Sequence, residues 1–213
     1  LEEISTSNRK DALDFIRRKY LHQLHEMTGR NVIAYYSGWL QKSGLNTTSI
    51  NDDDKNGLMA VIHGLDRSKG IDLILHTPGG DIAATESIVD YLKKMFDGDI
   101  RAIVPQLAMS AGTMICCSCN EIIMGKQSSL GPIDPQFSGI STHGVLEEFE
   151  RAVKEITKDP NTIPLWQVIV GKYHPTFMGD CKKAIDLSSE LTNNWLLDGM
   201  LKNEENAKEI ADS

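Results

Sequence analysis

The sequence lacks an excess of basic residues. Its 22 lysines and arginines are outnumbered by 30 aspartates and glutamates, which leaves a formal net charge of −8. A protein that binds nucleic acid or an anionic membrane through its surface needs a basic patch, so this charge argues against both partners. We interpret the acidity as a contribution to solubility.

Cysteine is also scarce. Three of the four cysteines, Cys116, Cys117 and Cys119, crowd into four residues of an apolar segment, and Cys181 stands apart from them. This bunching fits neither a disulfide framework nor a zinc site, because no second Cys or His pair lies at ligand spacing. We therefore expect reduced cysteines that pack as small apolar side chains, and no metal or organic cofactor.

Long apolar runs and targeting signals are missing as well. No run approaches the roughly 20 residues that a membrane-spanning helix needs, and no signal peptide is recognisable. These absences predict a cytoplasmic protein. The sequence begins at Leu1 rather than at Met, so a membrane anchor upstream of Leu1 stays open.

The hydrophobic residues that are present, 40% of 213, suffice for a single well-cored domain over 1–213. Short apolar runs alternate with helical stripes in its middle part, which predicts parallel β-α-β units. The expected strands are 31–37, 71–77, 100–104 and 121–125. The expected helices are 8–28 within an N-terminal helical segment 1–30, then segments around 52–65, 88–95, 110–119 and 146–156, and a helical C-terminal region 160–213 broken near Pro175 and around Ser188.

Three consecutive carboxylates, Asp52, Asp53 and Asp54, precede one of the expected helices. Such a cluster could hold a metal ion. Carboxylates at the start of a helix also cap its free N–H groups and interact favourably with its dipole. We prefer the capping interpretation.

A double glycine follows the expected strand 71–77 directly, in the stretch Thr77-Pro78-Gly79-Gly80-Asp81. Glycines there allow backbone conformations that other residues resist, and their N–H groups can point into a cleft, as an oxyanion hole requires. The same stretch is also typical of a tight strand-to-helix turn. The dinucleotide-binding pattern G-x-G-x-x-G is absent.

Ser110 follows the expected strand 100–104 and opens the next helix, within Ala108-Met109-Ser110-Ala111-Gly112. One interpretation is a helix cap. The other is a nucleophile, with the N–H of Ala111 as an oxyanion donor. The α/β-hydrolase elbow requires glycine at position 108, so that family is disfavoured. In parallel sheets, sites form at the carboxyl ends of strands, where Ser110 and the double glycine both lie.

Taken together, "HTPGGD" and "AMSAGT" resemble the superfamily of Clp protease and signal peptide peptidase A, with its crotonase-like fold. Wider stretches, among them "SAGTMICCSCNEIIMGKQSSLGPIDPQ" and "KYHPTFMGDCKKAI", resemble the serine dehydrogenase proteinase family within that superfamily. The resemblance covers nearly the whole chain. It implies an α/β fold of repeated β-β-α units with a helical C-terminal region, and a serine endopeptidase that cleaves polypeptide.

The resemblance also implies roles for particular residues. It assigns the nucleophile that forms an acyl-enzyme to Ser110, and the oxyanion-hole N–H groups to Gly79, with Gly80 beside it, and to Ala111. Because Clp-fold relatives form rings or stacked trimers, it further implies a homo-oligomer, such as a trimer, a hexamer or a ring. For its docking surface we expect aromatic residues of the C-terminal third: Trp166, Phe177 and Trp195.

The general base has three candidates. Asp134 occupies the place where the Clp protease has its histidine. His143 begins the following helix, and histidine exchanges protons near neutral pH. Lys154 lies on the same helix and would form a Ser-Lys dyad, although a lysine base needs burial. We favour His143 and keep Asp134 and Lys154 open. His76, at the end of an expected strand, could also border the cleft.

Two other classes of function compete with a peptidase. A crotonase-like acyl-CoA enzyme would use the glycines to hold a thioester enolate and would need carboxylates near the cleft, for which Asp81, Glu86 and Asp134 are available. A catalytically inactive scaffold would keep the fold without a base. The ATPase motif G-x-x-x-x-G-K-[ST] is absent, so any dependence on ATP would come from a partner.

Overall fold

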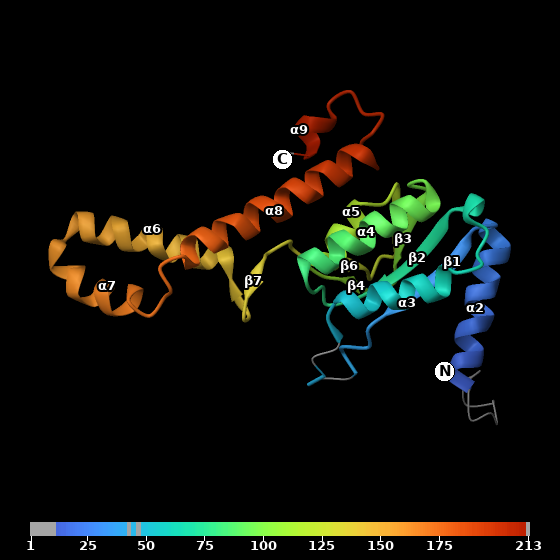
Figure 1. Ribbon diagram of the computed structural model, residues 1–213, viewed down its shortest axis with the longest axis horizontal. Helices are drawn as coiled ribbons and strands as arrows, with labels where there is room; N and C mark the ends of the chain where they lie inside the picture. The colour runs from blue at the N-terminus through green and yellow to red at the C-terminus, as the bar shows by residue number, and fades with distance from the viewer. Residues whose placement is uncertain (1–11, 42–43, 46–47, 212–213) are drawn as a thin grey trace.

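A parallel four-stranded sheet lies at the centre of the computed structural model, which describes residues 12–41, 44–45 and 48–211 (Figure 1). Neighbouring strands pair in the order β1 (Asn31–Tyr36), β2 (Ile71–His76), β3 (Ile100–Val104) and β5 (Glu121–Met124). All three pairs are parallel, with Tyr36 in register with His76 and Ile74 with Ile103. The predicted α/β class with a parallel sheet is confirmed, as are the four predicted strands within one residue.

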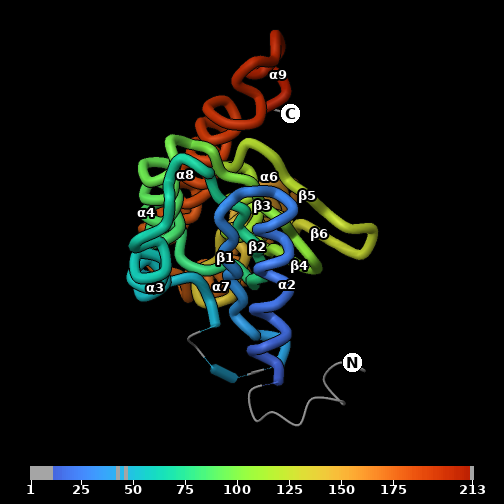
Figure 2. Tube along the Cα trace, turned by 90° about the vertical axis from the view of Figure 1, so that its right-hand side faces the viewer, coloured from blue at the N-terminus to red at the C-terminus, as the bar shows by residue number. Residues whose placement is uncertain are grey.

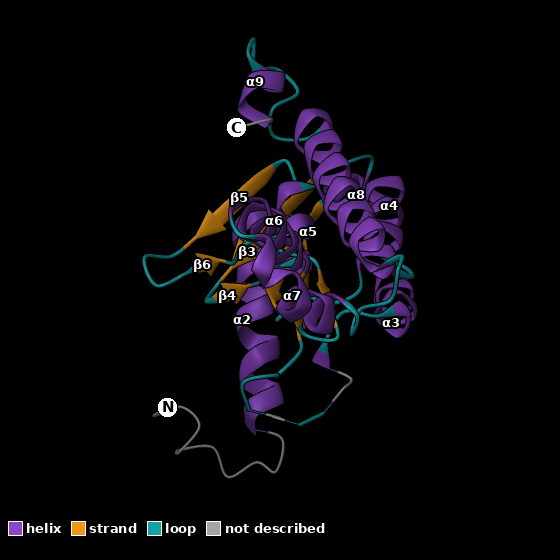
Figure 3. Ribbon diagram, turned by 90° about the vertical axis from the view of Figure 1, so that its left-hand side faces the viewer, coloured by secondary structure: helices purple, strands orange, loops and turns teal. Residues whose placement is uncertain are grey.

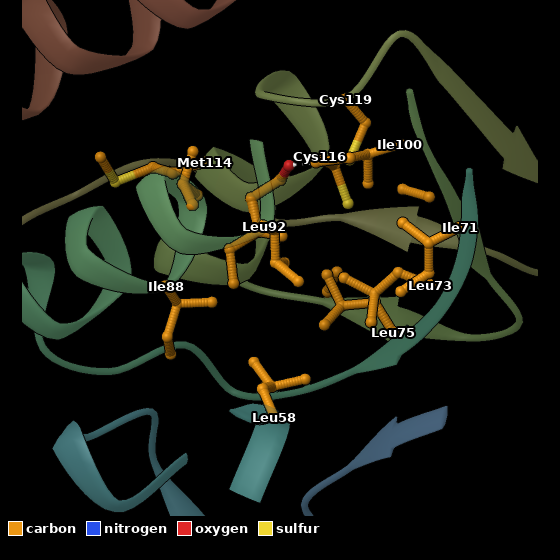
Figure 4. Packing of buried hydrophobic residues seen from close by; sticks show 14 of the residues in the cluster. Leu58, Ile71, Leu73, Leu75, Ile88, Leu92, Ile100, Met114, Cys116 and Cys119 are labelled. Carbon is orange, nitrogen blue, oxygen red and sulfur yellow. Dashed lines mark hydrogen bonds between the residues drawn. The ribbon is translucent and has the colours of Figure 1, made fainter. Parts of the chain in front are cut away.

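Three helices connect these strands and share one apolar core with them: α3 (Asp52–Ile62), α4 (Ile82–Phe96) and α5 (Ala111–Cys117). Figure 4 shows Leu73 and Leu75 of β2 facing Leu58 of α3 and Ile88 of α4. Alternate residues of a strand face opposite sides of the sheet, so Ile71, Leu73 and Leu75 all point into this core.

The cysteines pack in the same core. Cys116 and Cys119 are fully buried beside Ile100 (Figure 4), and all four cysteines are free thiols. Burial raises the pKa of the Cys119 thiol to about 12, which keeps it protonated and unreactive at neutral pH. The expectation that cysteines act as small apolar side chains is confirmed for this group.

The N-terminal helix α2 (Ala12–Thr28) packs against β1 (Figure 2). It ends at Gly29, whose φ of 68° is the left-handed conformation that glycine adopts at helix ends. Residues 8–11 of the predicted helix lie outside the described residues. Within the described ranges, no helix is long and apolar enough to cross a membrane.

The three consecutive aspartates form the first turn of α3, where carboxylates interact favourably with the helix dipole. Asn51 is the N-cap, and Asp54 completes a capping box by accepting a hydrogen bond of 2.9 Å from the Asn51 N–H. The part of the chain that the structure describes contains no cluster of three metal-ligating side chains. The capping interpretation of these carboxylates is therefore confirmed.

The predicted loop 128–144 contains short strands that the sequence pattern did not reveal. They are β6 (Ser129–Leu130), β7 (Gln136–Phe137) and β8 (Ile140–Ser141). Two further short elements lie earlier in the chain: the 3-10 turn η2 (Arg67–Lys69) and β4 (Leu107–Ala108). β4 pairs with β6, and β7 pairs with β8 in a hairpin. Two-residue strands carry no alternation, so hydrophobic periodicity cannot detect them.

The C-terminal helices form an arm that projects from the α/β body (Figures 1 and 3). Its elements are α6 (Thr142–Lys158), η3 (Pro160–Thr162), α7 (Ile163–Val170), α8 (Phe177–Asp198) and α9 (Ala207–Ala211). The predicted break near Pro175 is confirmed, but the break around Ser188 is wrong. α8 continues through Ser188, because its hydroxyl donates to the Ile185 carbonyl at 2.9 Å and is satisfied within the helix.

Two of the three aromatic residues expected to dock a partner lie in the chain's own interior. Trp166 and Trp195 are buried, and the Trp166 indole N–H donates to Glu155 at 3.0 Å. Phe177 is half-buried; it stacks on Tyr173 with ring centroids 5.5 Å apart and contacts Phe137 at 5.8 Å. The buried tryptophans leave little surface for a partner, and docking through Phe177 stays a prediction.

An ionic cluster holds the strands together on the other side of the sheet. Asp72 of β2 is fully buried and accepts hydrogen bonds from Arg30 at 2.8 Å and from Arg101 of β3 at 2.9 and 2.8 Å. Arg30 also binds Asp99; Asp99 and Asp72 raise the pKa of Arg30, and Asp72 and Glu121 raise the pKa of Arg101. Arg101 and Asp72 are register partners, so the cluster crosses neighbouring strands.

We predict that Asp72→Ala lowers the free energy of unfolding by about 3 kcal/mol, because it leaves two half-buried guanidinium groups without their shared partner. Lys154→Ala is the control, since its 3.8 Å pair with Glu150 lies in solvent and is worth at most about 1 kcal/mol. Urea denaturation measures both. Equal losses in the two variants would contradict the importance assigned to Asp72.

Candidate active site

The carboxyl ends of β2 and β3 bring the glycine loop and the Ser110 segment together. The Thr77 N–H donates to the Leu107 carbonyl, and the Met109 N–H donates to the Thr77 carbonyl, each at 3.1 Å. These two bonds join the segments directly before Gly79 and directly before Ser110. Residues thirty positions apart thereby become neighbours at one edge of the sheet.

Gly79 lies in close contact with the Ser110 segment. Its φ is 94°, a conformation that side chains resist. A Cβ added there would lie 2.6 Å from the Met109 carbonyl oxygen, 2.8 Å from the Ser110 Cβ and 3.1 Å from the Ala111 nitrogen. Both the conformation and the space therefore require glycine at this position.

Gly80 is confined from the opposite side by Ile50. The Ile50 N–H donates to the Gly79 carbonyl at 2.8 Å, and the Ile50 carbonyl accepts from Asp81 at 2.9 Å. A Cβ on Gly80 would collide with the Ile50 backbone. In such a parallel bridge, the N–H of the central residue points away from its partner, so the Gly80 N–H faces away from Ile50.

Ser110 has a backbone conformation that is rare for serine, with φ of 51° and ψ of −117°. Although it precedes α5, its side chain makes no capping hydrogen bond within the described residues. The capping interpretation therefore does not account for Ser110. Strained residues of this kind gather at functional sites, where the surrounding structure holds them.

A cavity of about 390 Å³ opens in front of Ser110. One wall is the glycine loop, and the other is formed by the β7 region and by Ala184 of α8. Its lining residues are Ser49, Pro78, Gly79, Gly80, Asp81, Ile82, Ser110, Met114, Ile133, Asp134, Pro135, Gln136, Phe137 and Ala184. The polar side chains of this lining are two hydroxyls, two carboxylates and the amide of Gln136.

Two of the three predicted oxyanion donors are available: among the hydrogen bonds of the described residues, the N–H groups of Gly80 and Ala111 have no acceptor. The N–H group of Gly79 is already used. The Gly79 N–H donates to the Thr77 hydroxyl at 3.1 Å. Gly79 is therefore placed correctly beside Ser110, with its donor already engaged.

The three base candidates occupy different places. Asp134 lines the Ser110 cavity, and its Oδ1 accepts a hydrogen bond of 2.9 Å from Ser141. His143 lines a separate cavity of about 300 Å³ beside α8, and Ile133 borders both cavities. Lys154 is 78% exposed and pairs with Glu150. The structure thus brings Asp134, and neither of the others, into the wall of the Ser110 cavity.

His76 does not border this cavity. It is buried on the other side of the sheet, where its ring stacks on Tyr36 with centroids 4.9 Å apart. Sequence reasoning also missed the apolar lining residues Ile133, Phe137 and Ala184, which come from a loop, a hairpin and a helix of the arm. No local pattern marks them, because only the position of the arm brings them to the cavity.

A serine in a strained turn thus lies beside a glycine loop at the carboxyl edge of a parallel sheet. The family model for ClpP-like SDH-type serine proteinases matches residues 4–213, and the chain belongs to that family.

Two relatives from Methanocaldococcus jannaschii, the uncharacterised proteins MJ0137 and MJ1495, are each 32% identical over 162 residues. The match covers 76% of this chain. It covers 51% of MJ0137 and 50% of MJ1495, so the chain spans about half the length of the curated relatives it matches.

We predict that Gly79→Ala destabilises the protein by about 2 kcal/mol more than Gly98→Ala, because only Gly79 adds crowding to backbone strain. Gly98 is a matched control: its φ is 76°, but nothing lies within 4 Å of an added Cβ. Thermal and urea denaturation of both variants measure the difference. Indistinguishable variants would mean that the close contact of Gly79 with Ser110 is not made.

Proposed function

We propose that this protein is a serine endopeptidase that cleaves polypeptide through an acyl-enzyme on Ser110. The observation that carries the proposal is the cavity that joins a strained, uncapped Ser110 to the glycine loop. Membership of a serine proteinase family supports the same reaction class. The repeated β-β-α units implied by the family resemblance belong to this proposal; β3 and β4 followed by α5 fit one such unit.

In the proposed reaction, the Ser110 hydroxyl attacks the scissile carbonyl carbon and loses its proton to a base. The carbonyl oxygen, now negatively charged, receives hydrogen bonds from the N–H groups of Gly80 and Ala111. The tetrahedral intermediate then expels the amine, which takes up the proton, and leaves an acyl-Ser110 ester. Water hydrolyses the ester and regenerates the enzyme.

Asp134 is the base that the geometry favours. Two carboxylates line the cavity, and Asp81 uses its side chain to cap α4 by accepting from the Ala84 N–H at 2.8 Å. Asp134 has only its Oδ1 engaged, by Ser141, in the described structure. Pro135 is buried beside it, and the Pro135 carbonyl accepts from the first residue of α6 at 3.0 Å. The loop that presents Asp134 is therefore anchored.

A fluorophosphonate probe should label the wild-type protein, and Ser110→Ala should abolish the label with an unchanged melting temperature. Labelling of the Ser110→Ala variant at the wild-type rate would refute the nucleophile. No labelling of the folded wild type would instead favour an inactive scaffold.

Asp134→Asn should lower kcat/KM on a fluorogenic peptide by a factor on the order of 10²–10⁴, the usual loss for a general base. His143→Ala and Lys154→Ala are the matched comparisons and should stay within a few-fold of wild type. A large loss in His143→Ala or Lys154→Ala together with an active Asp134→Asn would assign the base to that residue. The asparagine keeps the size of the side chain and can still accept from Ser141, so its folding is preserved.

The acyl-CoA alternative is less well supported. It requires free carboxylates near the glycine loop, and Asp81 is used as a helix cap while Glu86 does not line the cavity. One carboxylate, Asp134, then remains for a chemistry that usually needs a pair.

We further propose a homo-oligomer that docks through α7. This helix consists almost wholly of apolar residues, yet Trp166 is its one buried side chain, while Leu165 is 60% and Val168 64% exposed. A helix that is apolar on all sides is usually buried. The exposed face of α7 therefore replaces the buried aromatics as the proposed contact.

Light scattering at micromolar concentration should give a mass well above the 23.6 kDa of one chain. The double variant Leu165→Glu/Val168→Glu should lower that mass, because charges on α7 would have to be desolvated in the contact. Lys182→Glu on exposed α8 is the control for added acidic charge. A monomeric wild type would contradict the oligomer, and an unaltered mass in the double variant would exclude α7.

A further inference from the structure

Thr77 is fully buried between the two halves of the candidate active site, and its backbone already joins them. Its N–H donates to the Leu107 carbonyl, and its carbonyl accepts from the Met109 N–H. These residues belong to the segment that directly precedes Ser110. A side chain at this point is placed to control the distance between the glycine loop and the nucleophile.

The Thr77 methyl group contacts the Ser110 side of the site. A Cβ added to Gly112 of α5 would lie 2.5 Å from the Thr77 Cγ2, so the glycine at 112 leaves space for this methyl group. The first turn of α5 therefore rests on Thr77. The N–H of Ala111 belongs to the same turn.

The Thr77 hydroxyl contacts the glycine-loop side. It accepts the Gly79 N–H at 3.1 Å and thereby fixes the Pro78–Gly79 peptide, one residue before the Gly80 N–H.

From these contacts we propose that Thr77 is a positioning residue that sets the distance between the Gly80 and Ala111 N–H donors. Its hydroxyl holds the glycine loop next to Gly80, and its methyl group supports the first turn of α5, which contains Ala111. The inference rests on the proposed function, because those two donors matter only if an oxyanion forms between them. Thr77 does not touch the substrate. It acts through Gly79 and Gly112.

Two substitutions separate the two contacts. Thr77→Val keeps the shape but removes the hydroxyl, which leaves the Gly79 N–H without an acceptor. Thr77→Ser keeps the hydroxyl and removes the methyl group. We expect Thr77→Val to lower kcat on a fluorogenic peptide by a factor on the order of 10², the typical effect of a misplaced group, with KM within a few-fold of wild type. Thr77→Ser, which loses only the methyl contact, should lower kcat by a much smaller factor.

The methyl contact has its own test. Gly112→Ala should lower kcat because its new Cβ displaces the Thr77 methyl group or the first turn of α5. Adding Thr77→Ser removes the displaced methyl group, so the double variant Thr77→Ser/Gly112→Ala should have a higher kcat than Gly112→Ala alone. A double variant that is as slow as, or slower than, Gly112→Ala would overturn the methyl contact.

Hydrogen exchange gives a readout that does not depend on activity. Thr77→Val should exchange faster than wild type in residues 79–81, and Thr77→Ser should not, while residues 71–76 of β2 stay protected in both. Wild-type kcat in Thr77→Val, or equal losses in the valine and serine variants, would overturn the role of the hydroxyl.

The failure of the proposed function is recognised separately. A wild-type protein that neither cleaves peptide nor reacts with a fluorophosphonate would refute the peptidase. In that case, hydrogen exchange at residues 79–81 that is faster in Thr77→Val but not in Thr77→Ser still supports the positioning of the glycine loop by Thr77. Unchanged exchange in Thr77→Val refutes that positioning role. Melting temperatures of all variants separate local loosening from loss of the fold.

Discussion

Two main-chain hydrogen bonds between Thr77 and the segment 107–109 determine how close the glycine loop comes to Ser110. At that distance, a side chain at position 79 would collide with Met109 and Ser110, and one at position 112 would collide with Thr77. The short distance between the two segments therefore requires glycine at positions 79 and 112. The same approach leaves Ser110 in its strained turn, with its hydroxyl free of capping and exposed to the cavity.

The second wall of the cavity depends on a different part of the chain. The loop that carries Asp134 is anchored to the start of α6, and Phe137 of the β7–β8 hairpin packs on Phe177 at the start of α8. Any movement of the arm relative to the sheet would therefore change the width of the cavity. Family membership and this geometry together favour a peptidase in which the body supplies the nucleophile and the arm region supplies the second wall.

The ion pairs that stabilise the sheet and the candidate catalytic residues lie at opposite ends of its strands. The Asp72 cluster ties neighbouring strands together on one side, near the amino end of β2, while Gly79 and Ser110 lie beyond the carboxyl ends. The fully buried Asp72 carboxylate, which would be costly to bury alone, receives three hydrogen bonds there from two arginines. The strained turn at Ser110 lies at the opposite end, supported by the apolar core of α4 and α5 (Figure 4).

The sequence by itself determined the strands of the sheet, the role of the aspartates at the start of α3, and the neighbourhood of the two glycines and Ser110. These features follow from local periodicity and from the rule that parallel strands end at one edge of a sheet. It did not determine the base: His143 and Asp134 lie nine residues apart in one region, and only the path of the loop decides which of them lines the Ser110 cavity. The burial of Trp166 and Trp195 and the position of Thr77 between two segments were also decided only by the tertiary structure. Each depends on which surfaces meet after folding, and residues distant in the sequence make that contact without any shared pattern.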